Sequence, residues 1–256
     1  VLIALILMSG SALAEERSFA LNQDQGSDIY AWDGAQLTQS DTYFSINSIT
    51  NGETAPADEL FAAQSANQAL PEDGDYVAPH YALLDAKGAQ LTDFLYDSLE
   101  YDKTGDALLY SIDGVFGAMS RSLQELVPCE YDSVVSDGEG GFLLDAHSSA
   151  DAPPVLHMNK GGKAEPTGVK ARFYWGNLTE GLCAAVDENG LYGFLNGQGQ
   201  WAVKPKYDWV QNFTGGYAIV RQKNKTGVID KTGKSTVKHT YDDDRSMLSD
   251  GSAALL

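Results

Sequence analysis

Two stretches of this chain repeat each other at a spacing of 34 residues. Residues 181–200 read GLCAAVDENGLYGFLNGQGQ, and residues 215–234 read GGYAIVRQKNKTGVIDKTGK. Three pairs of residues align at this spacing: Gly193 with Gly227, Gly199 with Gly233, and Val186 with Val220. Periods of this length are typical of propellers and solenoids, in which each unit buries an apolar face against its neighbour. The repeat therefore restricts the architecture to an array of stacked units.

Weaker copies extend the pattern in both directions. Gly117 lies 76 residues before Gly193, and Tyr131 lies 76 residues before Tyr207, which is about two repeat units. Tyr241 follows Tyr207 after 34 residues. We therefore expect a repeat array over residues 77–256, with five to six units in the chain and the last repeat incomplete.

A degenerate copy lies in the middle of this array. Residues 159–163 (NKGGK) match residues 230–234 (DKTGK). Val155-Leu156 matches Val228-Ile229 if two extra residues are inserted before the turn. The sequence thus predicts a distorted unit between the better copies.

Turn signals separate short apolar runs. The segments DENG (187–190), NGQG (196–199) and DKTG (230–233) each begin with Asp or Asn, which can hydrogen-bond the turn backbone, and end in glycine, which tolerates positive φ. Short apolar runs between such turns are typical of antiparallel strands. We predict an all-β chain of tandem β-meander repeats of about 35 residues, three strands each, in a propeller-like array or, alternatively, an open β-solenoid.

These residues resemble the WG-repeat family of small bacterial β-repeats. The best copy comprises YGFLN (192–196), KPKYD (204–208) and FTGGYAIV (213–220). On this resemblance the structural positions of the repeat are the recurring glycines and tyrosines, namely Gly117, Gly193, Gly227, Tyr131, Tyr207 and Tyr241. The family has no agreed catalytic residues, so the resemblance implies none here.

The front of the chain departs from the repeat. Residues 1–14 (VLIALILMSGSALA) are an apolar run ending in a small-x-small site, which predicts a cleaved signal peptide truncated at its front and export to the extracellular space or cell envelope. Residues 15–53 are expected to form a divergent β cap or first repeat. Pro56 and an Ala-rich stretch predict a helical insertion or linker over residues 54–76.

Charge and cysteine content exclude some classes of function. The formal net charge is −19, so the basic stripe that nucleic-acid binding needs is absent and nucleic acid is not an expected partner. The apolar front segment is too short to insert across a membrane. Cys129 and Cys183 are compatible with one disulfide or with two free thiols.

No motif for catalysis or metal binding is present. His80, His147, His157 and His239 have no ligand spacing, so we expect them to be ordinary surface or turn residues and expect no metal or cofactor. There is no hydrolase elbow, phosphate loop or dinucleotide fingerprint. The chain is therefore expected not to be an enzyme.

Aromatic side chains are the better candidates for ligand contact. Tyr174, Trp175, Trp201 and Trp209 are predicted to bind, because rigid aromatics anchor many interfaces. The predicted function is a secreted, non-catalytic repeat module that binds a protein or glycan surface. Two alternatives remain: a hydrolase of polysaccharide or cell wall that uses an Asp/Glu pair with one raised pKa, and an accessory repeat segment of a larger protein.

Overall fold

The structure of the chain is a computed structural model. It describes residues 18–23, 26–31, 35–38, 43–50, 58–65, 80–103, 105–146, 154–174, 177–241, 246–247 and 253–254. The chain divides into two compact units, one ending at Tyr96 and the other beginning at Asp97. The described part of the chain holds no helix that is long and apolar enough to cross a membrane. The predicted signal peptide, residues 1–14, lies outside the described residues.

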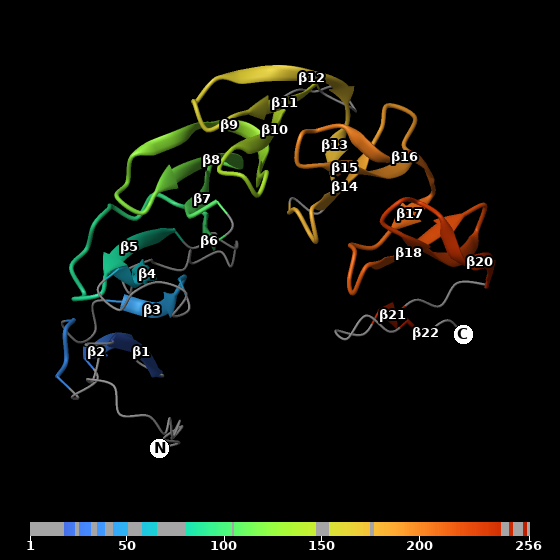
Figure 1. Cartoon of the computed structure of the whole chain (residues 1–256). Helices are drawn as coiled ribbons and strands as arrows, with labels where there is room; N and C mark the ends of the chain where they lie inside the picture. The colour runs from blue at the N-terminus through green and yellow to red at the C-terminus, as the bar shows by residue number, and fades with distance from the viewer. Residues whose placement is uncertain are drawn as a thin grey trace, which may run out of the picture. The chain divides into compact units, whose positions relative to one another are not determined.

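The first unit is built on one antiparallel sheet of five strands in chain order (Figure 1). Its strands are β1 (Ser18–Gln23), β2 (Gly26–Ala31), β3 (Tyr43–Ser48), β4 (Leu60–Ser65) and β5 (Tyr81–Asp85). Its core contains the buried residues Ile29, Tyr43, Ile46, Phe61, Ala63 and Leu84. The sequence boundaries predicted at residues 54 and 77 therefore fall inside a single sheet.

The predicted helix over residues 54–76 is wrong where the structure describes it. Leu60–Ser65 is strand β4, and it pairs with β3 on one side and β5 on the other. Its first four residues are all buried, so both faces of the strand are covered. A continuous apolar run flanked by two partners favours a central strand, and this tertiary pairing overrides the helix propensity of its alanines. Residues 54–57 and 66–76 of the predicted helix lie outside the described residues.

The second unit contains consecutive antiparallel meanders (Figure 1). A seven-stranded sheet is formed by β6 (Ser98–Asp102), β7 (Ala107–Ile112), β8 (Val115–Ser120), β9 (Glu125–Ser136), β10 (Phe142–Ala146), β11 (Pro154–Met158) and β12 (Ala164–Lys170). A four-stranded sheet follows, with β13 (Arg172–Phe173), β14 (Leu182–Val186), β15 (Tyr192–Asn196) and β16 (Trp201–Tyr207). The next four-stranded sheet contains β17 (Trp209–Val210), β18 (Tyr217–Gln222), β19 (Lys225–Asp230) and β20 (Ser235–Tyr241). A separate two-stranded sheet is formed by β21 (Ser246–Met247) and β22 (Ala253–Ala254).

The seven-stranded sheet is two repeats joined by one long strand. Strand β9 spans 12 residues and carries Tyr131-Asp132 in its middle. At the matching place in the next copy, Tyr207 ends β16 and Asp208 separates it from β17. Each full repeat is thus a four-stranded meander, whereas three strands were expected. The fourth strand arises because the closing strand of one repeat continues as the first strand of the next repeat.

The recurring glycines allow a β-bulge inside each sheet. A Cβ at Gly193 would lie 2.5 Å from the carbonyl oxygen of Val203 in the neighbouring strand. The register of strands β15 and β16 shifts at this place, and equivalent shifts flank Gly117 and Gly227. Only glycine lets the two backbones approach so closely. A substitution at these glycines would force neighbouring strands apart.

Two of the recurring tyrosines, Tyr131 and Tyr207, are core residues. Tyr207 is 1% exposed and Tyr131 is 9% exposed. Asp208, which follows Tyr207, accepts a hydrogen bond from Asn224 N of a nearby hairpin at 3.3 Å. Asp97, which follows the buried Tyr96, accepts one from Gly114 N at 3.3 Å, whereas Asp132, which follows Tyr131, accepts one from Arg172 at 2.8 Å. The aspartate after each of these tyrosines thus has a hydrogen-bond partner within the fold.

The structure corrects one alignment made from the sequence. Gly193 pairs with Ala185, whereas Gly227 pairs with Val220. The structural equivalent of Val220 is therefore Ala185 and not Val186. The shift arises because the loop after β14 is longer than the two-residue turn after β18.

The predicted turns are confirmed. In the turns that begin at Asp187, Asn196 and Asp230, the Oδ1 atom accepts hydrogen bonds from the backbone N–H groups two and four residues later. The glycine fourth in each turn has a φ between 69° and 78°. Local sequence thus determines the hairpin ends, as expected.

Consecutive sheets of the second unit pack through mixed apolar cores. Val135, Leu143 and Val155 of the seven-stranded sheet cluster with Cys183, Ala185 and Leu195 of the next sheet. The following junction is centred on Phe194 and Phe213, whose ring centroids lie 4.7 Å apart. Cys129 and Cys183 are free thiols, so the disulfide left open by the sequence does not form.

Candidate functional site

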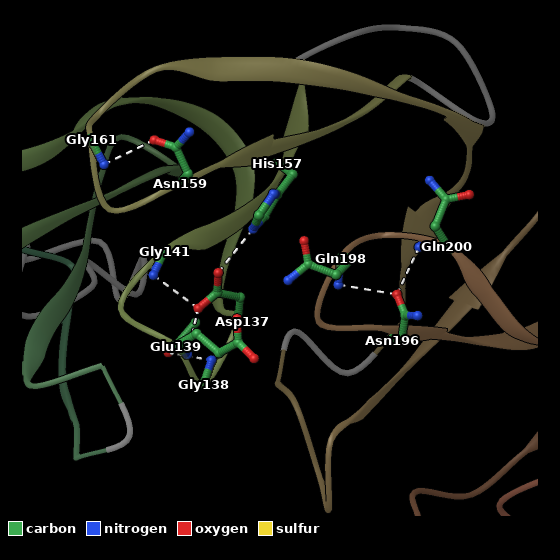
Figure 2. Close-up of polar contacts among 11 residues, drawn as sticks. Asp137, Gly138, Glu139, Gly141, His157, Asn159, Gly161, Asn196, Gln198 and Gln200 are labelled. Atoms are coloured by element: carbon green, nitrogen blue, oxygen red, sulfur yellow. Dashed lines mark hydrogen bonds and ion pairs between the residues drawn. The ribbon is translucent and has the colours of Figure 1, made fainter.

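A polar hollow lies where the seven-stranded sheet meets the next sheet. Its volume is about 270 Å³. One side is formed by strands β11 and β12 with the turn between them, and the other by the turn that joins β15 to β16 (Figure 2). The lining residues are His157, Asn159, Lys163, Glu165, Pro166, Thr167, Gln198 and Gln200.

His157 is held in the hollow by a buried carboxylate. Its Nε2 atom lies 2.9 Å from Oδ2 of Asp137, and the two side chains are 20% and 3% exposed. The other carboxylate oxygen of Asp137 accepts hydrogen bonds from the backbone N–H groups of Glu139 at 2.7 Å and Gly141 at 2.8 Å (Figure 2). Asp137 therefore closes its own turn and orients the histidine ring.

The charge state of Asp137 determines the tautomer of His157. Burial acts to raise the pKa of Asp137, but the hydrogen bonds from His157, Glu139 and Gly141 outweigh burial and hold the pKa below its ordinary value. Because an ionised carboxylate can only accept, Nε2 of His157 must carry the proton. Nδ1 is then an acceptor in the neutral ring, and no described residue forms a hydrogen bond with it.

The histidine occupies a position that is apolar in the other repeats. His157 stands two residues before the turn residue Asn159, as Phe194 stands before Asn196 and Val228 before Asp230. Phe194 is fully buried and Val228 is 5% exposed. The hollow thus lies where the chain departs from its own core pattern.

A hydrogen bond and a close approach of two backbones hold the two sides of the hollow together. The Gln200 side-chain amide donates to the carbonyl oxygen of Thr167 at 2.8 Å, across the two sheets. A Cβ on Gly197 would lie 2.6 Å from the carbonyl oxygen of Asp137, so glycine is needed where the turn meets the neighbouring sheet. The hollow is therefore largely formed before any ligand arrives.

A second unusual carboxylate lies in the same junction but does not line the hollow. Asp145 of β10 is 1% exposed, and its Oδ2 accepts a hydrogen bond from Phe173 N of β13 at 3.3 Å. Its Oδ1 has no hydrogen-bond partner among the described residues. Burial raises the pKa of Asp145 to about 6. Beside it, Arg172 donates to Asp132 at 2.8 Å, which links the two sheets again.

The groups in the hollow are suited to hydrogen bonding. The described residues contain no group of three or more His, Cys, Asp or Glu side chains that could hold a metal ion. Of the side chains that line the hollow, only Thr167 bears a hydroxyl, and this hydroxyl donates to the carbonyl oxygen of Val155 at 2.9 Å. The arrangement presents amide, imidazole and charged groups to a polar ligand.

The predicted aromatic residues are not brought to this hollow. Tyr174 is 37% exposed and lies edge-on to Tyr192, with ring centroids 4.8 Å apart. Trp201 is half-buried against the core between the sheets, and Trp209 is half-buried in β17. Trp175 lies outside the described residues. Their role in binding stays a prediction.

His157 was missed because the degenerate repeat was misaligned. The expected match of Val155-Leu156 to Val228-Ile229 needed two extra residues, whereas β11 runs directly into Asn159 and makes His157-Met158 the equivalents. The expectation of an ordinary surface or turn histidine is wrong for His157. A polar residue in a row of apolar repeat positions was the signal that could have found it.

One repeat of the chain matches a known family model. Residues 192–225 match the WG containing repeat, which supports the expected resemblance for this segment. No curated protein sequence matches the chain.

Solved structures with a similar fold are β-propeller proteins. A structure described as the eukaryotic initiation factor has a TM-score of 0.55 and 9% identity over 94% of this chain and 70% of that chain. Kluyveromyces lactis Hsv2 has a TM-score of 0.42 and 11% identity over 85% and 72%, and BamB from Moraxella catarrhalis has 0.36 and 12% over 80% and 66%. The first similarity shows the fold alone, and it confirms the expected all-β, propeller-like class.

Proposed function

We propose that this protein is a secreted, non-catalytic repeat module that binds a glycan or protein ligand in the hollow lined by His157 and Gln198. One observation carries the proposal. At this junction His157 stands where the next junction has the buried Phe194, and polar side chains lie around an open volume. The apolar run at residues 1–14 supports an extracellular or envelope location.

The geometry favours binding over hydrolysis. A hydrolase with a carboxylate pair needs one carboxyl with a raised pKa in contact with substrate. The carboxyl whose pKa is raised most clearly, Asp145, is closed off between two sheets. The carboxylate beside the hollow, Asp137, has a lowered pKa and uses both oxygens within the protein.

A variant that fills the hollow tests the proposal. The full chain is immobilised and screened against envelope glycans and secreted proteins, and each ligand is tested again on Gln198→Trp. We expect at least one saturable ligand whose binding is lost in this variant. The matched control is Thr232→Trp, which places the same side chain at the equivalent turn position away from the hollow. Ligands that bind all three proteins equally, or no ligand at all, would refute the proposed site.

A further inference from the structure

We propose that the hollow is a subsite for one uncharged sugar ring of a glycan. This inference rests on the proposed function and specifies its ligand. It depends on three properties of the lining: paired donors and acceptors, compensated charge, and small size with one apolar surface.

Carboxamides dominate the hydrogen-bonding groups of the hollow. Figure 2 shows the Gln198 carboxamide pointing toward His157 and Asp137 from the opposite side. Asn159 and Gln200 add two more amides to the lining. A carboxamide presents a donor and an acceptor side by side, and a hydroxyl can serve as either. Neighbouring hydroxyls of a sugar ring therefore match this lining better than a group that only accepts or only donates.

Charges around the hollow are already paired. Lys163 lies 2.6 Å from Glu165, and the Asp137 carboxylate uses both of its oxygens in hydrogen bonds within the protein. An anion in the hollow would meet the carboxylate of Glu165, and a cation would meet the ammonium of Lys163. Among the side chains that line the hollow, neither kind of ion finds an opposite charge that is not already paired, so an uncharged polar ligand fits best.

Size and shape limit the ligand to a small unit. Drug-sized ligands occupy pockets of about 300–1,000 Å³, and this hollow, at about 270 Å³, lies just below that range. Pro166 provides an apolar ring surface in an otherwise polar lining, against which the C–H face of a sugar can pack. The hydrogen bond from the Gln200 side chain to the carbonyl oxygen of Thr167 fixes one side of the hollow before a ligand binds. This lowers the entropy that is lost on binding.

The test compares ligand classes on the full chain by isothermal titration. The probes are neutral hexose oligomers, N-acetylhexosamine oligomers, a hexuronate oligomer, and short acidic and basic peptides. We expect saturable binding of a neutral oligomer and none of the hexuronate or peptides. Gln198→Ala should weaken that binding about tenfold, since it removes hydrogen bonds worth about 1.4 kcal/mol together.

Two further variants make the result decisive. Gln198→Glu keeps the shape of the side chain but removes its donor, so it should also weaken binding. Thr232→Ala changes the equivalent turn outside the hollow and should leave binding unchanged. Neutral oligomers that do not bind, or that bind Gln198→Ala as well as the natural chain, overturn the inference. If a peptide or secreted protein binds in a Gln198-dependent way instead, the inference fails while the proposed function stands. If no ligand class depends on Gln198, both fail.

Discussion

The buried carboxyl of Asp145 should make the stability of this protein depend on pH in an unusual direction. Burial raises the pKa of Asp145 to about 6, and its Oδ1 lacks a hydrogen-bond partner among the described residues. An unfolded chain has an Asp pKa of about 3.9. The folded state therefore holds the proton more tightly, so this group contributes stability below about pH 4 that is lost as pH rises through about 6.

Replacing Asp145 by Asn removes this dependence. The amide oxygen of Asn can still accept the hydrogen bond from Phe173 N, but the side chain carries no charge at any pH. Moving a carboxyl pKa from about 4 to about 6 corresponds to about 3 kcal/mol. We expect Asp145→Asn to be more stable than the natural chain by up to about 3 kcal/mol at pH 8, and the two proteins to converge to within about 1 kcal/mol near pH 4.

Urea unfolding followed by tryptophan fluorescence between pH 4 and pH 8 measures this difference. The informative quantity is the free energy of unfolding of the variant minus that of the natural chain at each pH, because all other titrating groups then cancel. Leu144→Val, on the neighbouring residue of the same strand, should cost about 1 kcal/mol at every pH. A difference for Asp145→Asn that stays flat from pH 4 to pH 8 would refute the assignment of a raised pKa to this carboxyl.

The remaining predictions concern single positions. Gly193→Ala, which forces a methyl against the neighbouring backbone, should lower the free energy of unfolding by about 1–3 kcal/mol. Gly161→Ala should cost less, because its methyl would meet only the end of the Asn159 side chain, at 3.0 Å; denaturant titration measures both. Asp137→Ala should destabilise the chain more than Asp187→Ala. Each substitution removes two hydrogen bonds to backbone N–H groups of a turn, but only the first also removes a buried contact with a histidine. Equal decreases in melting temperature for the two variants would contradict this. Burial raises the pKa of Cys183 to about 12, so this thiol should resist an alkylating reagent in the native protein and react after unfolding, which mass spectrometry can follow.

Local features of the fold were predictable because their causes are local. The turns at Asp187 and Asp230 were expected from an Asx residue followed by glycine, and their side chains make the expected backbone bonds. Gly193 was expected to be a structural position of the repeat, and a register shift lies at this glycine between β15 and β16. In each case the residue type alone determines which backbone conformation is low in energy.

Features that depend on pairing between distant strands were not predictable. Leu60–Ser65 has the composition of a helix, but β3 and β5 flank it and make it a central strand. The contact of His157 with Asp137 joins residues 20 positions apart through the register of β9, β10 and β11. The raised pKa of Asp145 comes from burial between two sheets, which the sequence does not specify. Residues that depart from the repeat are the ones for which these distant contacts matter most.

Burying His157 beside Asp137 is a costly way to fill the space where two sheets meet. At the next junction the equivalent position is Phe194, which packs edge-on against Phe213 without burying any charge. Replacing buried, hydrogen-bonded charged groups by well-packed apolar residues is often neutral or stabilising. Stability alone therefore does not account for a polar pair here. What the pair adds is an oriented imidazole beside Gln198 in a hollow, and that supports a binding role for this junction.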